Sequence, residues 1–379
     1  MANFLDKSKN LLSADNQNLW RLGQVADKVK IFSWPNKIAD DLFNAGSGVV
    51  ISGGGQGGSQ VNTIDFIQTS TEGNASDFGD LQSARRGGSG PSSSTRMVHL
   101  GGNMSPNTVI DYFTTQTLGN ASDFGNLTDG RWGIGSGSDR TRAVFGGGDS
   151  PGDVDIIDFI TFASTGDALD FGDLSANRRY TTGGADSTRT LFAGGAAGPV
   201  NIIEHVTTQS TGDAKDFGDL TSARQSGSQS ACSPTRAVFG GGDPSTVNII
   251  DFVTTSTLGN AADFGDKTAG GSYASGLTSN AVRGLATATG YGTNSNVIEY
   301  ITIATLGNAT DFGDLSQSRS ALSSTASSTR GVFQNGLTPG TQNTMDYVQI
   351  PTLGNAVDFG NSLDTIVAGV SISNAHGGL

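Results

Sequence analysis

The residues of this sequence whose type and spacing could do chemistry are the aspartates of an Asp-Phe-Gly triplet. In phosphoryl-transfer enzymes the aspartate of such a triplet holds magnesium at a single active site. Here the triplet occurs seven times, at intervals of 46 to 48 residues, beginning at Asp77, Asp123, Asp170, Asp216, Asp263, Asp311 and Asp358. A fixed period of this length is the signature of a repeat array. The triplet is therefore predicted to be part of the architecture.

Each triplet lies in a longer motif that reads Gly, Asn or Asp, Ala, any residue, Asp, Phe, Gly, then Asp or Asn. Asn and Asp cap helical turns and form Asx-turns. We predict a structural turn anchored by a buried phenylalanine. The anchors are Phe78, Phe124, Phe171, Phe217, Phe264, Phe312 and Phe359. The alternative is calcium binding, because Asn74, Asp77 and Asp80 offer oxygen ligands, although their spacing by three differs from that of an EF-hand loop.

A second set of residues recurs in register with the triplets. Arginine opens a predicted strand in six repeats, at Arg96, Arg142, Arg189, Arg236, Arg283 and Arg330. Val49 takes this position in the first repeat. A guanidinium group binds either a carboxylate or a carbonyl oxygen well. We predict that these arginines form a repeated ion pair or a repeated bond to a backbone carbonyl.

A catalytic or metal site would require residues that break the repeat. The three histidines, His99, His205 and His376, fall in different repeats and lack metal-ligand spacing. No Ser-His-Asp or Cys-His pattern is recognisable, and the glycine runs lack the lysine of a phosphate-binding loop. Four further arginines are candidates for an anion site or for pairing with aspartates: Arg85, Arg86, Arg178 and Arg179. We predict no enzymatic activity, no metal site and no cofactor.

The composition excludes several function classes. The formal net charge of the 379 residues is −13, which argues against nucleic-acid binding, since phosphates require clustered lysine and arginine. The single cysteine, Cys232, excludes an intramolecular disulfide. No window approaches the roughly 18 apolar residues that span a bilayer, and the N-terminal residues have no apolar core of signal-peptide length. We expect a protein made in the cytoplasm, without membrane insertion.

The elements that position these residues are predicted to be short strands. Residues 141–148 and 156–165 are β-branched and aromatic runs bounded by Gly, Pro, Asp and Ser. Both faces of the strand at residues 248–255 are largely apolar, so both must be covered by neighbouring layers. A radial stack of small sheets meets this requirement.

The two ends of the array are out of phase in a way that predicts ring closure. The first repeat begins with the predicted strand at residues 48–55. It does not contain the segment that precedes the equivalent strand in the other repeats. Residues 363–373, after the last triplet, match that missing segment. One C-terminal strand and three N-terminal strands would then complete one sheet, which also hides the sheet edges.

The order of an Ala-Arg-Arg segment, a strand, a Gly-Gly pair and a strand with Asp-Phe or Asp-Tyr resembles a kelch repeat over about residues 47–374. The resemblance implies an all-β, seven-bladed β-propeller with four strands per blade. Phe252 and Phe264 replace the more closely spaced Tyr and Trp of kelch repeats. The sequence of residues 250–266, IDFVTTSTLGNAADFGD, also resembles repeats in structural proteins of tailed bacteriophages, notably marine ones.

Residues 1–46 do not share the repeat and form a predicted helical adaptor, whereas residues 47–379 form the predicted propeller. Apolar residues recur at helical spacing after Ser13, a plausible N-cap. A segment of this size rarely folds alone, so its apolar stripe must rest on the propeller or on a partner, and we expect a partner. The predicted docking residues are Leu19, Trp20, Leu22, Val25, Val29 and Trp34.

These observations favour a non-enzymatic structural protein of a phage virion. Its N-terminal segment would dock multiple copies of the propeller on the capsid, neck or tail. The alternative is an adhesin that recognises a host-surface glycan or protein through the variable loops that follow the Gly-Gly pairs. These loops are small and polar and have almost no aromatic residues. This composition argues against a site that binds sugars by stacking them on aromatic rings.

Overall fold

The computed structural model describes residues 49–373, apart from 104–106, 116, 197, 226–229, 244–246, 271–276 and 288–293 and the side chains of 49–52 and 277. Contacts divide the chain into two compact units, Met1–Phe43 and Asn44–Leu379. The described residues belong to the second unit. The predicted helical adaptor and its docking residues lie outside them.

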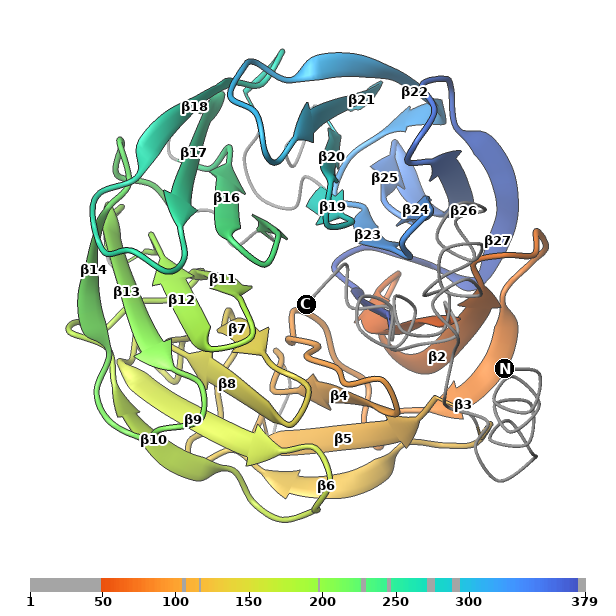
Figure 1. Cartoon of the computed structure of the whole chain (residues 1–379). Coiled ribbons are helices and arrows are strands. Elements are labelled where there is room, and N and C mark those ends of the chain that lie inside the picture. The colour runs from red at the N-terminus through yellow and green to blue at the C-terminus, as the bar shows by residue number, and fades with distance from the viewer. Residues whose placement is uncertain are drawn as a thin grey trace, which may run out of the picture. The chain divides into compact units, whose positions relative to one another are not determined.

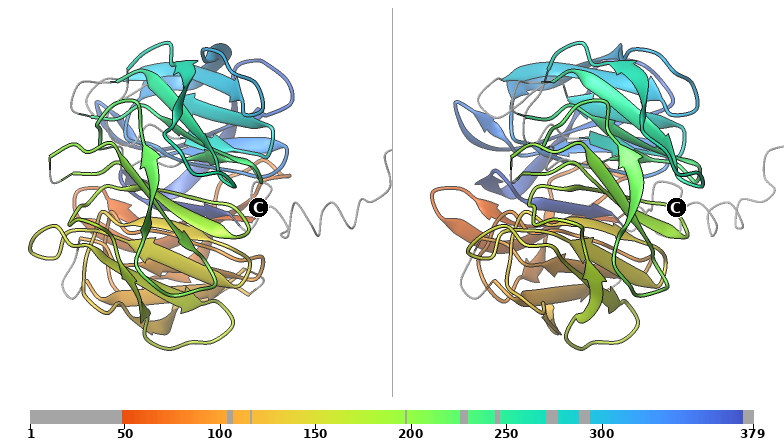
Figure 2. Two further views of the ribbon diagram at one scale, coloured as in Figure 1. Left: turned by 60° about the vertical axis from the view of Figure 1, so that its left-hand side comes forward. Right: turned by 90° about the vertical axis from the view of Figure 1, so that its left-hand side faces the viewer.

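Seven small antiparallel sheets surround a central axis, which confirms the predicted all-β, seven-bladed propeller (Figure 1). Blade 3 shows the pattern from the axis outward: β7 (Gly135–Ser138), β8 (Arg142–Gly146), β9 (Ile156–Thr161) and β10 (Leu169–Asp173). Side views show the blades packed face against face around the ring (Figure 2). Each blade therefore covers the apolar faces of its neighbours, as the two-sided strands require.

The other blades have the following strands. Blade 1 contains β28 (Val370–Ser373), β1 (Val49–Gln56), β2 (Gln60–Gln68) and β3 (Ser76–Asp80); blade 2 contains β4 (Arg96–Leu100), β5 (Val109–Thr114) and β6 (Ser122–Asn126); blade 4 contains β11 (Thr182–Ala185), β12 (Arg189–Ala193), β13 (Ile202–Thr207) and β14 (Lys215–Asp219). Blade 5 contains β15 (Ala231–Cys232), β16 (Arg236–Gly240), β17 (Ile249–Thr254) and β18 (Ala262–Asp266); blade 6 contains β19 (Leu277–Ser279), β20 (Arg283–Thr287), β21 (Ser295–Thr302) and β22 (Thr310–Arg319); blade 7 contains β23 (Ser323–Ala326), β24 (Arg330–Gln334), β26 (Gly340–Gln349) and β27 (Val357–Ile366), with β25 (Leu337–Thr338) beside β26.

Blade 2 has isolated bridges where the other blades have an innermost strand. Ser89 pairs with Leu100 and Ser92 with Met97. Pro91 stands between the two bridges, and its carbonyl accepts a hydrogen bond from the amide of Val98 at 3.0 Å. A proline has no amide hydrogen, so it interrupts the ladder without removing the fourth layer.

The ring closes as predicted, by one C-terminal strand added to three N-terminal ones. β28 pairs with β1 in an antiparallel register from Val50 opposite Ser373 to Gly53 opposite Val370. The two ends of the colour scale therefore meet in one blade (Figure 1). We call the boundary between blades 7 and 1 the seam and any boundary between neighbouring blades a junction.

The core lies between blades. One cluster joins Val98 and Phe124 of blade 2 to Phe145 and Ile160 of blade 3, all of them at most 3% exposed. Burying large aromatic and aliphatic side chains contributes roughly 1.5–3 kcal/mol each, so the ring is stabilised mainly across its junctions.

Candidate functional site

The prediction that the Asp-Phe-Gly segment is a turn is wrong, because the triplet lies within the outermost strand of every blade. In blade 3, Asp170 pairs with Asp158 and Gly172 with Ile157, so Phe171 is an extra residue and forms a β-bulge. The Asp170 carboxylate accepts a hydrogen bond from the Gly172 amide at 3.1 Å, which holds the bulge. All seven triplet phenylalanines are 2–3% exposed.

Each of these phenylalanines meets a ring on the neighbouring strand. Phe171 packs edge-to-face on Phe159, with 5.8 Å between ring centroids. The same contact occurs in every blade, with His205 as the partner in blade 4. Aromatic pairs of this geometry contribute about 0.5–1.5 kcal/mol beyond their buried area.

The residues before the triplet join each blade to the preceding one. The amides of Gly119 and Ala121 donate to the carbonyls of Phe78 and Asp80 at 2.8 Å. The Asn120 side chain accepts from the Asp80 amide at 3.1 Å, so it bonds the preceding blade rather than capping its own turn. Equivalent bonds occur at all seven junctions, including the seam. We call this ring of hydrogen bonds the belt.

The triplet glycine allows the belt to form. Gly125 has a φ of +143°, and a Cβ atom there would lie 2.3 Å from the carbonyl oxygen of Gly166 in the next blade. Only a residue without a side chain permits both this backbone conformation and this approach. Contact between blades thus explains the glycine of the motif.

The six in-register arginines bond backbone carbonyls of the next blade. The guanidinium groups of Arg96, Arg142, Arg189, Arg236, Arg283 and Arg330 donate over 2.6–3.2 Å. Arg330 crosses the seam to the carbonyl of Thr69 at 2.7 Å. Five of the six also lie 4.2–4.8 Å from an aromatic ring centroid of their own blade. Of the two predicted alternatives, the carbonyl bond is the one that all six share, and Arg330 also lies 3.9 Å from the Glu72 carboxylate.

A second set of cations forms buried ion pairs. Arg131 Nη1 lies 3.0 Å from Asp158 Oδ2, and neither side chain is exposed. Five other pairs repeat this arrangement: Arg85–Asp111, Arg178–Glu204, Arg224–Asp251, Arg319–Asp346 and Lys267–Glu299. Burial lowers the pKa of each arginine, and the carboxylate opposes that shift. Arg85 and Arg178, predicted as anion ligands or aspartate partners, are therefore held by carboxylates.

Among the described residues, blade 1 has no such cation. Its equivalent carboxylate, Asp65, is 6% exposed and accepts a hydrogen bond from the Leu363 amide at 3.0 Å. Desolvation by burial, helped by the charges of Asp364 and Asp77, raises the pKa of Asp65 to about 6. The seam is thus electrostatically different from the other six junctions.

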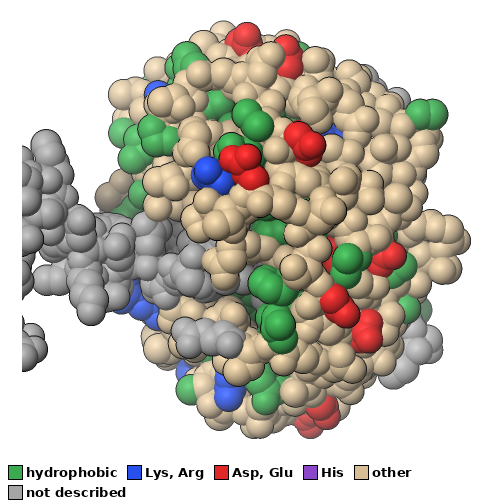
Figure 3. Space-filling view, turned by 90° about the vertical axis from the view of Figure 1, so that its right-hand side faces the viewer, with side chains coloured by type: hydrophobic (Ala, Val, Ile, Leu, Met, Phe, Trp, Pro, Cys, Tyr) green, Lys and Arg blue, Asp and Glu red, His purple; other side chains and the backbone are tan. Residues whose placement is uncertain are grey.

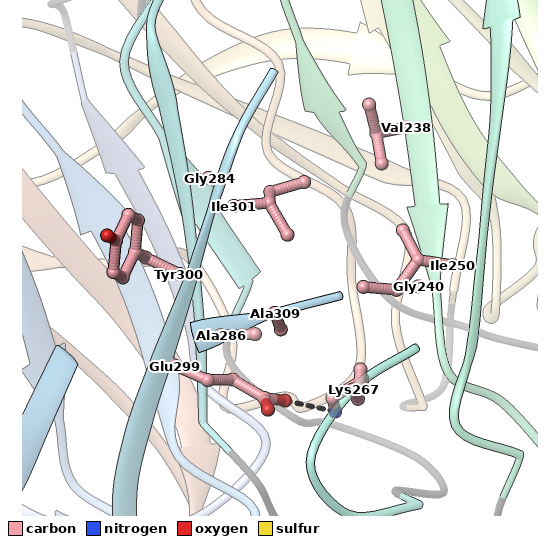
Figure 4. A pocket seen from close by; sticks show the side chains of 10 residues that line it. All are labelled: Val238, Gly240, Ile250, Lys267, Gly284, Ala286, Glu299, Tyr300, Ile301 and Ala309. Carbon is pink, nitrogen blue, oxygen red and sulfur yellow. Dashed lines mark ion pairs between the residues drawn. The ribbon is translucent and has the colours of Figure 1, made fainter. Parts of the chain in front are cut away.

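A cavity lies at the junction of blades 5 and 6, beside the ion pair of blade 6 (Figure 4). Lys267 and Glu299 lie at one end, and Gly284, Ala286 and Ala309 are among the lining residues. Ala286 takes the place that Phe145 has in blade 3. The cavity of about 20 Å³ has room for about one water molecule, so it is a packing gap rather than a substrate pocket.

Replacing Ala286 with valine is expected to stabilise the protein by about 0.5–1 kcal/mol, because added methyl groups enter the cavity and valine favours strands. The measurement is the urea midpoint of unfolding. The same substitution at Ala143, which is fully buried in a core cluster, should destabilise by about 1–3 kcal/mol through overpacking. A lower midpoint for Ala286→Val would contradict the assignment of a gap.

The two described histidines, His99 and His205, are buried in the scaffold. His99 is fully buried, and its Nδ1 accepts a hydrogen bond from Arg85 Nε at 3.1 Å. Desolvation, with a contribution from Arg85, lowers the pKa of His99 well below its usual value. His376 lies outside the described residues. In the described part of the chain, no group of three or more His, Cys, Asp or Glu side chains is placed to hold a metal ion.

An aromatic pair at the junction of blades 3 and 4 was missed by the sequence analysis. Trp132 and Tyr180 pack edge-to-face at 5.4 Å, and Arg179 lies 5.5 Å from the Tyr180 ring. Arg179 bonds Asp149 at 2.6 Å. Trp132 also forms a backbone bridge with Asp149, in the variable loop after β8. The pair was missed because it comes from the segments that enter blades, not from the variable loops themselves.

Tyr180 has a φ of +53°, and its amide donates to the Gly133 carbonyl of the preceding blade at 2.8 Å. Gly87 and Gly133 adopt the same positive φ at the equivalent positions. A tyrosine in this conformation is less favourable than glycine by about 1–2 kcal/mol. Its side chain must offset this cost, and its contact with Trp132 is one contribution.

Exposed apolar side chains recur on the loops between the third and fourth strands of the blades. Four equivalent leucines before the belt, Leu118, Leu258, Leu306 and Leu353, are 56–65% exposed. Loops of an antiparallel meander alternate between the two ends of its strands, so these leucines lie on the face opposite Trp132. On the side of the ring that Figure 3 shows, apolar side chains form separate groups among acidic ones.

The chain was compared with known proteins. No protein-family model matches it, and no curated protein sequence matches it. Among the described residues, no helix is long and apolar enough to cross a membrane. The propeller fold is therefore established by the structure, whereas kelch membership remains a resemblance.

Proposed function

We propose that this protein is a non-enzymatic structural component of a tailed-phage particle, in which the N-terminal segment docks a rigid propeller on the capsid, neck or tail. One observation carries the proposal. The polar side chains that recur in the repeat are used within the scaffold, in the belt, the arginine-to-carbonyl bonds and the buried ion pairs.

The amino-acid sequence of the repeats supports the phage proposal, because it resembles repeats in phage structural proteins. The exposed leucines offer apolar contacts for neighbouring proteins of an assembly. In this proposal Leu19, Trp20 and Leu22 of the N-terminal segment supply further contacts. Both features suit a protein that is held among others in several copies.

The test is co-sedimentation of the protein with particles from its native source. We expect the full chain to sediment with particles and to remain after a high-salt wash. A chain without residues 1–45 should fold as a propeller and stay in the supernatant. Recovery of the full chain solely as a free soluble protein would overturn the proposal.

A second candidate function is host-surface recognition through the face that carries Trp132 and Tyr180. The aromatic pair beside Arg179 and Asp149 favours it, because aromatic rings and charged groups on loops of a rigid scaffold are common in binding sites. Trp132→Ala is then expected to reduce binding to host cells at least tenfold, measured by flow cytometry. Leu118→Ala on the opposite face is the control. Equal binding by both variants would remove this candidate.

A further inference from the structure

The seam contains an isoleucine in the place of a buried arginine. A Cβ atom on Gly55 would lie 2.8 Å from the Cδ1 of Ile366. At two other junctions the equivalent glycines, Gly148 and Gly242, would meet the Cδ of Arg131 and Arg224 at 3.1 and 3.0 Å. Ile366 therefore occupies the position of the arginine stem, without a guanidinium group to reach Asp65.

In the described structure, the buried carboxylate of the seam also has no side-chain donor. At other junctions a threonine hydroxyl bonds the buried carboxylate, as Thr128 does with Asp158 at 2.6 Å and Thr221 with Asp251 at 2.6 Å. Leu363 stands at this position in the seam, so only its amide bonds Asp65. Among the described residues, Asp65 Oδ1 is buried and has no hydrogen-bond partner.

A second carboxylate lies near enough for its charge to act on Asp65. Asp364 follows Leu363 in the chain, and its Oδ2 is also buried without a partner within the described part of the chain. Asp346 and Glu299 leave one oxygen unbonded as well, but each of them is paired with a cation. Within the described residues, the seam therefore combines two carboxylates at the one junction where no arginine or lysine pairs with the blade's buried carboxylate.

We propose that Asp65 and Asp364 bind one calcium ion, which takes the place of the guanidinium group at the seam. Two carboxylates leave a local charge that a divalent cation neutralises, and calcium accepts carboxylate, carbonyl and water oxygens in flexible geometry. With only two protein carboxylates, we expect a Kd on the order of 10⁻⁴–10⁻³ M. This site differs from the belt aspartates and goes beyond the proposed structural function.

The test is thermal unfolding of the full chain at pH 7.5 with calcium or with chelator. Calcium at about 10 mM should raise the Tm of the natural chain by a few degrees above the value with magnesium at the same concentration. Asp65→Asn, which preserves side-chain size, should remove this rise. Ile366→Arg should remove it too and raise the Tm in chelator, since it restores the ion pair. Calorimetric titration should give about one calcium per chain.

Three results would overturn the proposal. The first is an equal calcium-dependent rise in the natural chain and in Asp65→Asn. The second is a stoichiometry of about seven ions, which would place calcium at the belt. The third is no rise in the natural chain while Ile366→Arg is stabilised in chelator, which would mean that the seam carboxylates are neutralised by protons. If Ile366→Arg does not fold, Asp65→Asn decides the first two results.

Discussion

Replacing Arg131 with leucine is expected to lower the free energy of unfolding by about 3–5 kcal/mol. The substitution leaves the Asp158 carboxylate without a cation at a position with no exposure to solvent. It also removes the bond from Arg131 Nε to the Gly147 carbonyl, which is 2.9 Å long. Urea unfolding followed by circular dichroism measures the effect through the midpoint and the slope.

The control is the double variant Arg131→Leu with Asp158→Asn. Because the amide carries no charge, it should recover more than half of the lost stability. An outer-face variant, Arg142→Leu, removes a partly exposed guanidinium group that bonds the carbonyl of Thr208. Its expected loss is about 1–2 kcal/mol, because no charge is left buried. Equal losses for Arg131→Leu and Arg142→Leu would contradict the distinction between the two sets of arginines.

Replacing Gly125 with alanine is expected to destabilise the protein by about 3 kcal/mol or more, or to prevent folding. The new Cβ atom would overlap the Gly166 backbone, with contacts of 2.3–2.6 Å, so blades 2 and 3 would have to separate locally. The expected results are a lower Tm and faster hydrogen exchange at the Gly166 and Ala168 amides, which are bonded across this junction.

Gly166 supplies a matched control. Its φ of +153° is close to that of Gly125, but a Cβ atom there has no atom within 4 Å in the described structure. Gly166→Ala therefore carries the backbone strain without the overlap and should lose only about 1–3 kcal/mol. Similar losses at both positions would mean that backbone conformation, rather than contact between blades, explains the triplet glycine.

The sequence predicted the fold well because the repeat supplies seven samples of the same pattern. The period gave the number of blades, and the phase difference between the two ends gave the closing strand, now seen as β28 beside β1. The burial of Phe171 and its six equivalents agrees with the predicted anchor. Such features depend on periodicity and hydrophobic pattern, which are local properties of the sequence.

Contacts between blades could not be predicted in the same way. Asn120 reads as a local turn residue, but its partner is the Asp80 amide, 40 positions earlier in the chain. The hydrogen bond that it forms depends on how two sheets pack. The partner of Arg85, which is Asp111, was open for the same reason, since several aspartates lie at similar sequence distances.

The aromatic pair on the loop face shows a different limit. Trp132 and Tyr180 are 48 positions apart, and each departs from the repeat only in its own copy. A search for such single departures at equivalent positions would have found them, as well as Ile366. The positions where one repeat differs from the other six are therefore the most informative places in this sequence.

Hydrogen exchange at the belt tests the central claim, that the recurring residues close and hold the ring, most directly. In a closed ring, the Gly73 and Ala75 amides, which donate across the seam to Phe359 and Asn361 at 2.8 Å, should be protected as strongly as Gly119 and Ala121. Mass spectrometry of peptides that cover these residues provides the measurement. Strong protection at all seven junctions would support a closed ring held by the motif. Exchange at the seam as fast as in an unstructured loop would contradict it.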